Sequence, residues 1–270
     1  METKLVRIAE ISAKSKHPIF TSVYHLINED MLKQCHKELD GSKAVGIDKV
    51  TKDEYGKNLD RNIKDLVQRL KNKSFKPLPS LRVYIPKANG KKRPLGIASY
   101  EDKIVQMAVK KILGTIYEPR FLNCMYGFRP NRGCHKAIKE VYQRISYGKI
   151  SYIVDADIKG FFDHIDHEWM MKFLEWNIQD KNLLWLIRKY LKAGIMEQGK
   201  FEPTEEGSAQ GSVMSPMLAN IYMHHVLTLW FKLVVKKEMQ GECFLVNFAD
   251  DFVAGFQYKS EAERYYKELK

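Results

Sequence analysis

Two adjacent carboxylates, Asp250 and Asp251, interrupt the apolar run "FLVNFADDFVAGF". Removing a carboxylate from water is unfavourable, and a second negative charge beside it adds repulsion. A hard divalent cation such as Mg²⁺ offsets both effects, because it prefers oxygen ligands. The segment reads as strand, two-residue turn, strand, with Asp250 and Asp251 at the turn. Asp is common in turns, but Phe252 stands where a hairpin turn favours glycine. We therefore expect Asp250 and Asp251 to bind metal.

A third carboxylate ends the other apolar strand segment, "SYIVDADIKGFF". Asp155 and Asp157 are two residues apart and would share one face of that strand, with Asp157 nearest its end. If the two strands pair side by side, Asp157 lies close to Asp250. Three carboxylates on two strands predict a site for two Mg²⁺ ions, with Mn²⁺ as the alternative, as in nucleotidyl transfer to a 3′-hydroxyl.

Periodicity and turn signals predict the elements that must position these acids. We expect three regions: an N-terminal helical extension (1–45), a basic region (46–150) and a region of strands and helices (151–270). The basic region contains a hairpin at 81–97 that turns at Asn89-Gly90. The third region includes a helical stretch at 167–195. This order predicts an α+β fold in which helices pack on an antiparallel sheet.

The charge of the chain, +12 overall, is concentrated in its first half. Residues 1–150 carry 31 Lys and Arg against 15 Asp and Glu, whereas residues 151–270 carry 14 against 18. Nine basic residues and no acid lie between Asp65 and Glu101. A run of like charge is usually a solvated surface, but one of this length favours a polyanion, either nucleic acid or a triphosphate.

Several classes of protein are not expected. The four cysteines show no C-x-x-C spacing, which favours reduced intracellular thiols over a zinc site. The N-terminus lacks the apolar block of a signal peptide, and no apolar run reaches the length of a membrane span. We expect a cytoplasmic protein with no membrane partner.

Six motifs together resemble a known family. "DADIKGFFDHIDH", "QGSVMSP" and "FADD" resemble the palm of reverse transcriptases, and in detail that of the bacterial group II intron-encoded enzymes, or maturases. "GIDKVT", "RVYIPKANGKKRPLGI" and "YEPRFLNCMYGFRPNRGCHKAI" precede them in that family's order. Two positions depart from the pattern: Phe248 replaces the usual Tyr, and Ala209 replaces the usual Pro.

The resemblance implies a right-hand polymerase fold. Residues 46–150 would be the fingers and 151–270 the palm, with the primer grip and thumb absent, as in a fingers-and-palm fragment of a longer protein. It also implies that Asp157, Asp250 and Asp251 are the catalytic metal ligands.

The same resemblance assigns a set of residues to the incoming nucleotide. Two cations beside the hairpin turn would bind the triphosphate, a backbone segment after the first Asp motif would bind phosphate oxygens, an aromatic residue would lie beneath the sugar, and the Gln-Gly motif would lie against the base pair. These residues are Lys87, Arg93, Ile158, Phe161, Phe162, Gln210 and Gly211, with Phe162 preferred beneath the sugar. The alternatives are a solubilising surface for the cations, core packing for the aromatics and an ordinary loop for Gln-Gly.

Nucleic-acid contacts are expected elsewhere in the basic half. Arg129 and Arg132 alternate with aromatic residues in "YGFRPNRGCHKA", which suits a strand bound by stacking and phosphate contacts. A loop that begins a helix explains the same residues, and both interpretations stay open. Lys91 and Lys92 would add general electrostatic attraction.

The leading hypothesis is an RNA-directed DNA polymerase, a nucleotidyltransferase that extends a DNA primer with dNTPs on an RNA template. By resemblance it would also bind group II intron RNA and assist its splicing and mobility. The alternatives are a non-catalytic RNA-binding splicing cofactor and another bacterial class, such as retron, defence or diversity-generating reverse transcriptases. Weak or absent extension is expected of a fingers-and-palm fragment, and a homodimer is left open.

Overall fold

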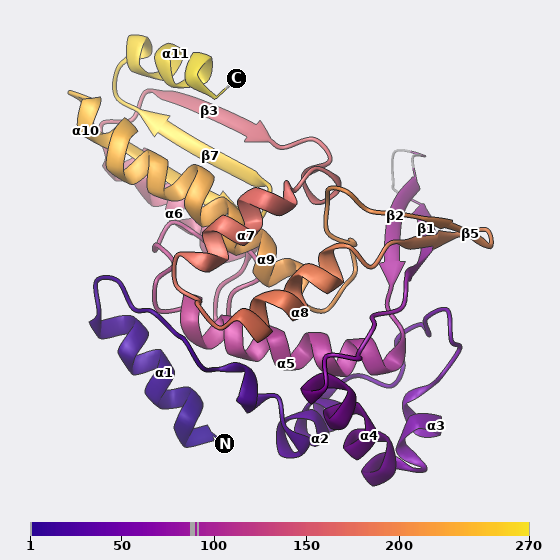
Figure 1. Cartoon of the computed structure of the whole chain (residues 1–270). Helices are drawn as coiled ribbons and strands as arrows, with labels where there is room; N and C mark the ends of the chain where they lie inside the picture. The colour runs from indigo at the N-terminus through magenta and orange to yellow at the C-terminus, as the bar shows by residue number, and fades with distance from the viewer. Residues whose placement is uncertain (1, 87–89, 91, 270) are drawn as a thin grey trace. The chain divides into compact units, whose positions relative to one another are not determined.

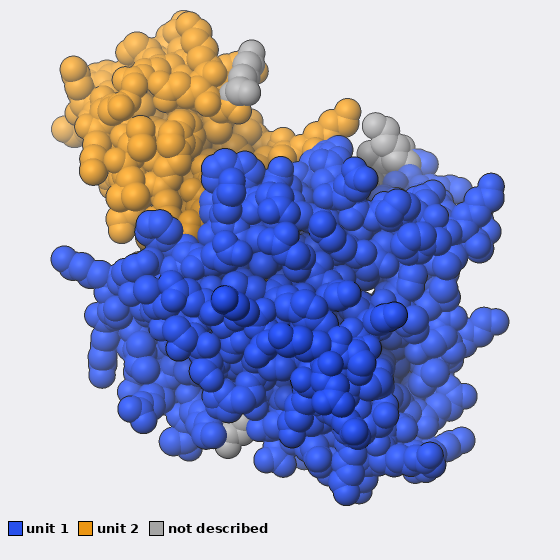
Figure 2. Space-filling model, in the orientation of Figure 1, with its two compact units in different colours: residues 1–119, 162–217 blue, residues 120–161, 218–270 orange. Residues whose placement is uncertain are grey.

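The computed structural model of the chain describes residues 2–86, 90 and 92–269 (Figure 1). The predictions made for Lys87 and Lys91 therefore lie outside the described residues. The chain divides into two compact units, each made of two segments (Figure 2). Unit 1 comprises 1–119 and 162–217, and unit 2 comprises 120–161 and 218–270.

Helices form most of unit 1. They are α1 (Glu2–Lys14), η1 (Tyr24–Leu26), α2 (Glu29–Glu38), α3 (Lys52–Gly56), α4 (Leu59–Lys71), α5 (Tyr100–Tyr117), α7 (His167–Glu175) and α8 (Lys181–Leu191). The 18-residue helix α5 forms the centre of the core, and α1 and α2 pack against it. Ser99 caps α5 by accepting a hydrogen bond from the backbone N of Asp102. The Ile, Val, Ala and Leu residues of α5 from Ile104 to Ile116 are fully buried.

Unit 1 also contains a four-stranded sheet with the strand order β2-β1-β4-β5. β1 (Ser80–Pro86) pairs antiparallel with β2 (Lys92–Ile97), which confirms the predicted hairpin. β4 (Ile195–Glu197) joins β1 in parallel, and β5 (Lys200–Glu202) follows it. The sheet thus draws strands from both segments of unit 1.

The helical stretch predicted at 167–195 is wrong in detail, because it breaks into α7 and α8 and ends in β4. Asp180 explains the break. Its carboxylate accepts from the backbone N of Asn182 and Leu183 and so caps α8. The same carboxylate accepts from the backbone N of Val23 and Tyr24 at 2.7 Å, which ties the start of α8 to the N-terminal segment.

Unit 2 is built on a three-stranded antiparallel sheet with the order β3-β7-β6. Its strands are β3 (Tyr152–Asp157), β6 (Cys243–Phe248) and β7 (Asp251–Phe256). One face packs on α6 (Cys134–Tyr147) through Phe244, Val246 and Val253. The alternate residues of β7 form the other face, where the ring of Phe256 meets those of Phe231 and Tyr265, the latter from α11 (Lys259–Glu268). The predicted antiparallel sheet with packed helices is confirmed.

One long helical run, Ser215–Glu238, follows the Gln-Gly motif. It consists of α9 (Ser215–Met223), the π-helical segments η3 (His224–Thr228) and η4 (Phe231–Val235), and α10 (Lys236–Glu238). In the described part of the chain, this run alone has the length and apolarity of a membrane span. This differs from the expectation that no apolar run reaches that length. Because 56% of its most apolar window is buried, the run packs as the core helix of a globular fold does.

The two units cut across the expected ranges 46–150 and 151–270. Residues 120–150 belong to unit 2 because α6 packs on β6, about 100 residues further along the chain. Residues 162–217 belong to unit 1, where β4 pairs with β1. Both associations are non-local contacts, which periodicity does not reveal.

A buried histidine in η3 leads to a prediction about acid stability. His224 is 5% exposed, packs edge-on against Phe121 and shares a hydrogen bond of 3.2 Å with the hydroxyl of Thr228. Burial lowers the pKa of His224 from 6.5 to about 3. The positive charges that add to this effect are those of His225, Arg120, Arg129 and Lys232.

The folded state therefore favours the neutral imidazole, and its contribution to stability is complete above pH 6.5 and lost as the pH falls toward 3. When the pH falls from 7 to 5, we expect the free energy of unfolding to decrease by about 2 kcal/mol because of His224. Urea denaturation of the wild type and of His224→Gln at both pH values measures this, since the variant should lose stability less steeply. Parallel pH profiles would contradict the prediction.

Candidate active site

The strand register brings two of the three predicted metal ligands together. Asp157 at the end of β3 is directly opposite Asp251 at the start of β7. β7 is the central strand, so Asp157 pairs directly with Asp251, and Asp250 in the adjoining turn is held beside the end of β3 by a hydrogen bond from the backbone N of Ile158. Asp155 and Asp157 lie on one face of β3, as predicted, because the alternating register places them opposite Val253 and Asp251.

The turn between β6 and β7 is displaced by one residue from the predicted one. Phe248 pairs with Asp251, so Ala249 and Asp250 form the two-residue turn and Asp251 is already in the strand. Ala249 has a φ of 61°, in the left-handed region that a glycine occupies more easily. The amide of Asn247, which is 1% exposed, donates to the backbone O of Ala249 at 2.7 Å and stabilises this conformation.

Gly127 lies directly against the turn. A Cβ at position 127 would be 2.4 Å from the backbone N of Ala249. Its own backbone O accepts a hydrogen bond of 2.9 Å from the amide of Asn220. Beside it, the backbone N of Tyr126 donates to the O of Asn247 at 2.8 Å. The acidic turn therefore rests on a fixed backbone segment that leaves no room for a side chain.

The electrostatics of the pair favour a bound cation. Burial raises the pKa of Asp251, and the negative charges of Asp157 and Asp250 and a hydrogen bond with Asp157 raise it further. An acid whose ionised form is destabilised by neighbouring carboxylates gains most from a positive ion between them.

The donor set fits Mg²⁺, which prefers carboxylate oxygens and is commonly held by one or two carboxylates together with water and substrate phosphates. As they stand, no three His, Cys, Asp or Glu side chains form a group that could hold a metal ion, within the residues that the structure describes. The structure thus brings together Asp157 and Asp251, while Asp250 influences the pair from the turn through its charge. Binding of two ions stays a prediction.

Two of the residues expected near the nucleotide belong to unit 2 with the carboxylates. The backbone N of Ile158 donates to the O of Asp250 at 3.3 Å, so it holds the acidic turn beside the end of β3. Phe161 is 5% exposed, and its ring centroid is 6.1 Å from that of Tyr222. The core alternative thus accounts for Phe161, and its assignment to the nucleotide stays a prediction.

In unit 1, the fingers strand and the Gln-Gly motif meet directly. With its amide oriented to satisfy both groups, the Gln210 side chain accepts two hydrogen bonds from the Arg93 guanidinium, at 2.9 and 3.1 Å, and donates to the O of Pro94. The backbone N of Gly96 donates to the O of Gln210 at 2.6 Å. Gly211 has a φ of 106°, and a Cβ there would be 3.1 Å from the O of Gly96. Three predicted nucleotide-binding residues, Arg93, Gln210 and Gly211, are thus neighbours.

Beside this contact lies a hollow of about 270 Å³ in unit 1. Phe162, the aromatic residue preferred beneath the sugar, lines it together with Gln210 and Gly96. Arg82 also lines it, and sequence reasoning missed this residue. Little in the sequence selects Arg82, because it is one of nine cations in the basic run between Asp65 and Glu101. Only the pairing of β1 with β2 sets it apart from the other eight.

The Gln210 contact leads to a prediction about stability. Gln210→Ala removes the acceptor of the Arg93 guanidinium and the donor to Pro94, so it should lower the free energy of unfolding by about 1 to 2 kcal/mol. Gln210→Glu should lose less, because a carboxylate still accepts from Arg93. Chemical denaturation measures both, with Gln68→Ala on the exposed face of α4 as the matched control. An unchanged midpoint for Gln210→Ala would show that the contact adds no stability.

The arginines predicted to bind nucleic acid hold the loop before α6. Arg129 donates to the O of Leu122 at 2.9 Å and of Met125 at 3.1 Å. Arg132 donates to the O of Asn123 at 2.7 Å, and its guanidinium lies 5.1 Å from the centre of the Tyr126 ring.

These contacts support the loop interpretation, although no side chain caps α6. A nucleic-acid contact of the same residues stays a prediction. Lys92 is exposed at the start of β2, as its general electrostatic role requires.

Comparison with known proteins is consistent with this geometry. Residues 85–270 match the family model described as reverse transcriptase (RNA-dependent DNA polymerase). The chain is 37% identical over 239 residues to the group II intron-encoded protein LtrA of Lactococcus lactis subsp. cremoris, covering 88% of this chain and 40% of LtrA. It is 37% identical over 187 residues to protein YkfC of Escherichia coli, covering 68% of this chain and 49% of YkfC. The chain thus spans less than half the length of either relative.

Two solved structures, a Cas6-RT-Cas1–Cas2 complex and a partial one, also align with the chain. Each alignment covers 91% of this chain, at 18% identity and a TM-score of 0.48. It covers 41% of the matched chain in the partial complex and 26% in the other.

Proposed function

Because the chain belongs to the reverse transcriptase (RNA-dependent DNA polymerase) family, we propose that it carries the catalytic site of an RNA-directed DNA polymerase that adds dNTPs to a primer 3′-hydroxyl. The observation that carries this proposal is the register that sets Asp157 opposite Asp251 at the acidic turn. Two carboxylates in contact at the end of a sheet, with a third in the adjacent turn, suit the binding of divalent cations.

In this proposal each residue has a defined task. Asp157 and Asp251 hold the divalent ions, with Asp250 adding negative charge. When bound, Mg²⁺ neutralises charge on the triphosphate and lowers the pKa of the attacking 3′-hydroxyl. Arg93, oriented by Gln210, binds phosphate oxygens, because a guanidinium fork matches their geometry. Phe162 lies beneath the sugar and excludes a 2′-hydroxyl by its bulk.

Primer extension on an RNA template tests the proposal. The chain is expected to add dNTPs only weakly to an annealed DNA primer when Mg²⁺ is present, and this addition should stop when EDTA removes the metal and resume when Mg²⁺ is restored. A primer on the same RNA with a non-complementary dNTP is the control for templating. Addition that persists in excess EDTA would overturn the assignment.

We also propose that the chain binds structured RNA of the group II intron class. The net charge of +12 and the 37% identity to a group II intron-encoded protein support this. Its binding should weaken steeply with salt, because neutralised phosphates release counterions. Filter binding of a group II intron RNA over a salt series, beside a polyanionic peptide as the control, measures this role independently of polymerisation. Affinity that does not change with salt would count against it.

A further inference from the structure

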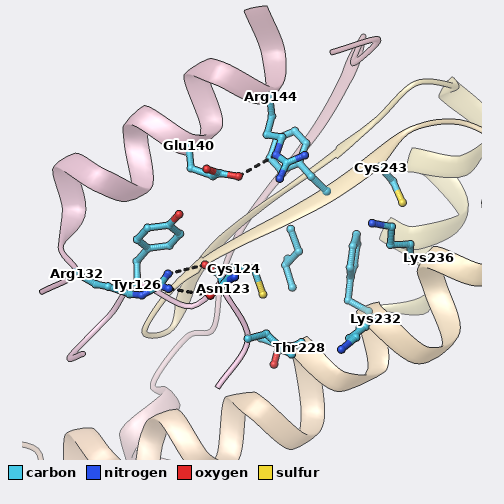
Figure 3. A pocket seen from close by; sticks show the side chains of 14 residues that line it. Asn123, Cys124, Tyr126, Arg132, Glu140, Arg144, Thr228, Lys232, Lys236 and Cys243 are labelled. Atoms are coloured by element: carbon cyan, nitrogen blue, oxygen red, sulfur yellow. Dashed lines mark hydrogen bonds and ion pairs between the residues drawn. The ribbon is translucent and has the colours of Figure 1, made fainter. Parts of the chain in front are cut away.

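Unit 2 contains a hollow of about 660 Å³ between α6 and the long helical run. Its described lining residues include none of the predicted metal ligands. Glu140 and Arg144 of α6 line one wall, and Lys232 and Lys236 line the other (Figure 3). The part of β6 that lines it, Cys243 to Leu245, is at the opposite end of the strand from the acidic turn. The hollow is therefore separate from the candidate active site.

The charges around the hollow select an anion. Arg132, Arg144, Lys232 and Lys236 line it, and Glu140 is the one acid among the described lining residues. Glu140 is bound to Arg144 at 2.9 Å, so it leaves the lysines uncompensated. Lys232 and Lys236 are four residues apart on one helix, where like charges repel. Neither lysine side chain forms a hydrogen bond or ion pair with the described residues, and a bound phosphate would relieve their repulsion.

Three aromatic side chains contribute to the lining of the hollow, from both sides of the sheet. Tyr126, Phe231 and Phe244 line it, and all three are less than 9% exposed. The guanidinium of Arg132 lies 5.1 Å from the centre of the Tyr126 ring, which forms a stacked pair of planar groups at one end. Bases of single-stranded RNA are commonly bound by stacking on aromatic and guanidinium planes.

The outer edge of β6 supplies hydrogen-bonding groups in the same place. Asn247 directs its backbone N and O away from β7, because it exchanges hydrogen bonds of 2.8 Å with Cys124 and Tyr126. By the alternation of an antiparallel strand, Leu245 and Cys243 direct their backbone groups the same way, toward the hollow. No backbone partner for them appears on this side among the described residues, so they can pair with the edge of a base.

We propose that this hollow binds one unstacked nucleotide of an RNA strand. Its phosphate lies between Lys232, Lys236 and Arg144, and its base lies along the edge of β6 at Leu245, beside the Arg132–Tyr126 pair. The volume is within the usual range for ligand pockets, about 300 to 1,000 Å³. The proposal rests on the RNA-binding part of the proposed function and is independent of the polymerase chemistry. An acidic peptide matches the charge but has no planar base to lie beside the Arg132–Tyr126 pair.

Photocrosslinking tests the location. The 270-residue chain carrying Asp251→Asn is mixed with a short oligouridylate containing 4-thiouridine, in EDTA, and irradiated. Crosslinks should map to peptides that contain Tyr126, Phe231 or Phe244. Crosslinks confined to other parts of the chain would overturn the proposal. Because the metal and Asp251 are removed, the result does not depend on polymerase activity.

Affinity measurements test the chemistry. Lys232→Ala combined with Lys236→Ala should weaken oligouridylate binding about tenfold and reduce the slope of log K against log salt by about 0.7, the value for one phosphate contact on a single strand. The matched control replaces Lys139 and Lys237, which are exposed on the same two helices but do not line the hollow. Equal losses in both double variants would overturn the proposal, as would a polyglutamate peptide that competes as well as RNA.

Discussion

Asp157→Asn and Asp251→Asn should each reduce dNTP addition to a primed RNA template by at least about 1,000-fold while leaving the chain folded. The two side chains are opposite each other across β3 and β7, and each amide removes one of the two charges that a divalent ion needs. Single-turnover addition of one dNTP, followed on a sequencing gel, measures the loss. Asp250→Asn should also reduce the rate of dNTP addition.

Measuring the stability of these variants shows whether a loss of dNTP addition comes from the changed site or from unfolding. The pKa of Asp251 is raised in the folded state, so its ionised form destabilises the fold at neutral pH. Asp251→Asn should therefore melt at the same temperature as the wild type or higher. Asp155→Asn, on the same face of β3, is the matched control and should keep its activity. Near-normal addition by Asp251→Asn would exclude the proposed site.

Gly127→Ala should lower the free energy of unfolding by about 2 to 4 kcal/mol and abolish dNTP addition. The new Cβ would be 2.4 Å from the N and 3.1 Å from the Cα of Ala249, and backbone atoms cannot rotate away as a flexible side chain does. Hydrogen bonds to Asn220 and Asn247 hold the segment in place, so the acidic turn must move. A displacement of about 1 Å is enough to reduce catalysis about 100-fold.

The control for this variant lies six residues away in the same loop. A Cβ at Gly133 meets no atom within 4 Å, and the extended backbone there accepts alanine. Gly133→Ala should therefore have the free energy of unfolding and the rate of dNTP addition of the wild type. Urea denaturation gives the stability, and activity is compared at a temperature where Gly127→Ala is folded. Equal stability of the two variants would show that the segment can shift freely.

Local sequence signals predicted the parts of the site that depend on one element. Two-residue alternation placed Asp155 and Asp157 on one face, and Asn89-Gly90 located the hairpin of β1 and β2. The turn at Ala249 and Asp250 was misplaced because an alanine occupies a backbone conformation that propensity reserves for glycine. The helical stretch 167–195 was overextended because the capping of α8 by Asp180 and the pairing of β4 with β1 were not recognised.

Other features depend on contacts that no local pattern reports. The order β3-β7-β6 decides that Asp157 faces Asp251, and parity alone does not give strand order. Arg93 and Gln210 are more than 100 residues apart, yet their side chains share two hydrogen bonds. The division of the predicted nucleotide-binding residues between the two units follows from the same kind of long-range packing.

Ala249 also bears on how this turn can vary. Its methyl group narrows the range of dihedral angles open to the residue before Asp250, at a conformational cost of about 1 to 2 kcal/mol. A glycine would remove this conformational cost and let the turn adopt several conformations. The Asp250 carboxylate would then be in its catalytic orientation for a smaller fraction of the time. Among related sequences, a glycine at this position should therefore accompany higher thermostability and slower turnover, and an alanine the reverse.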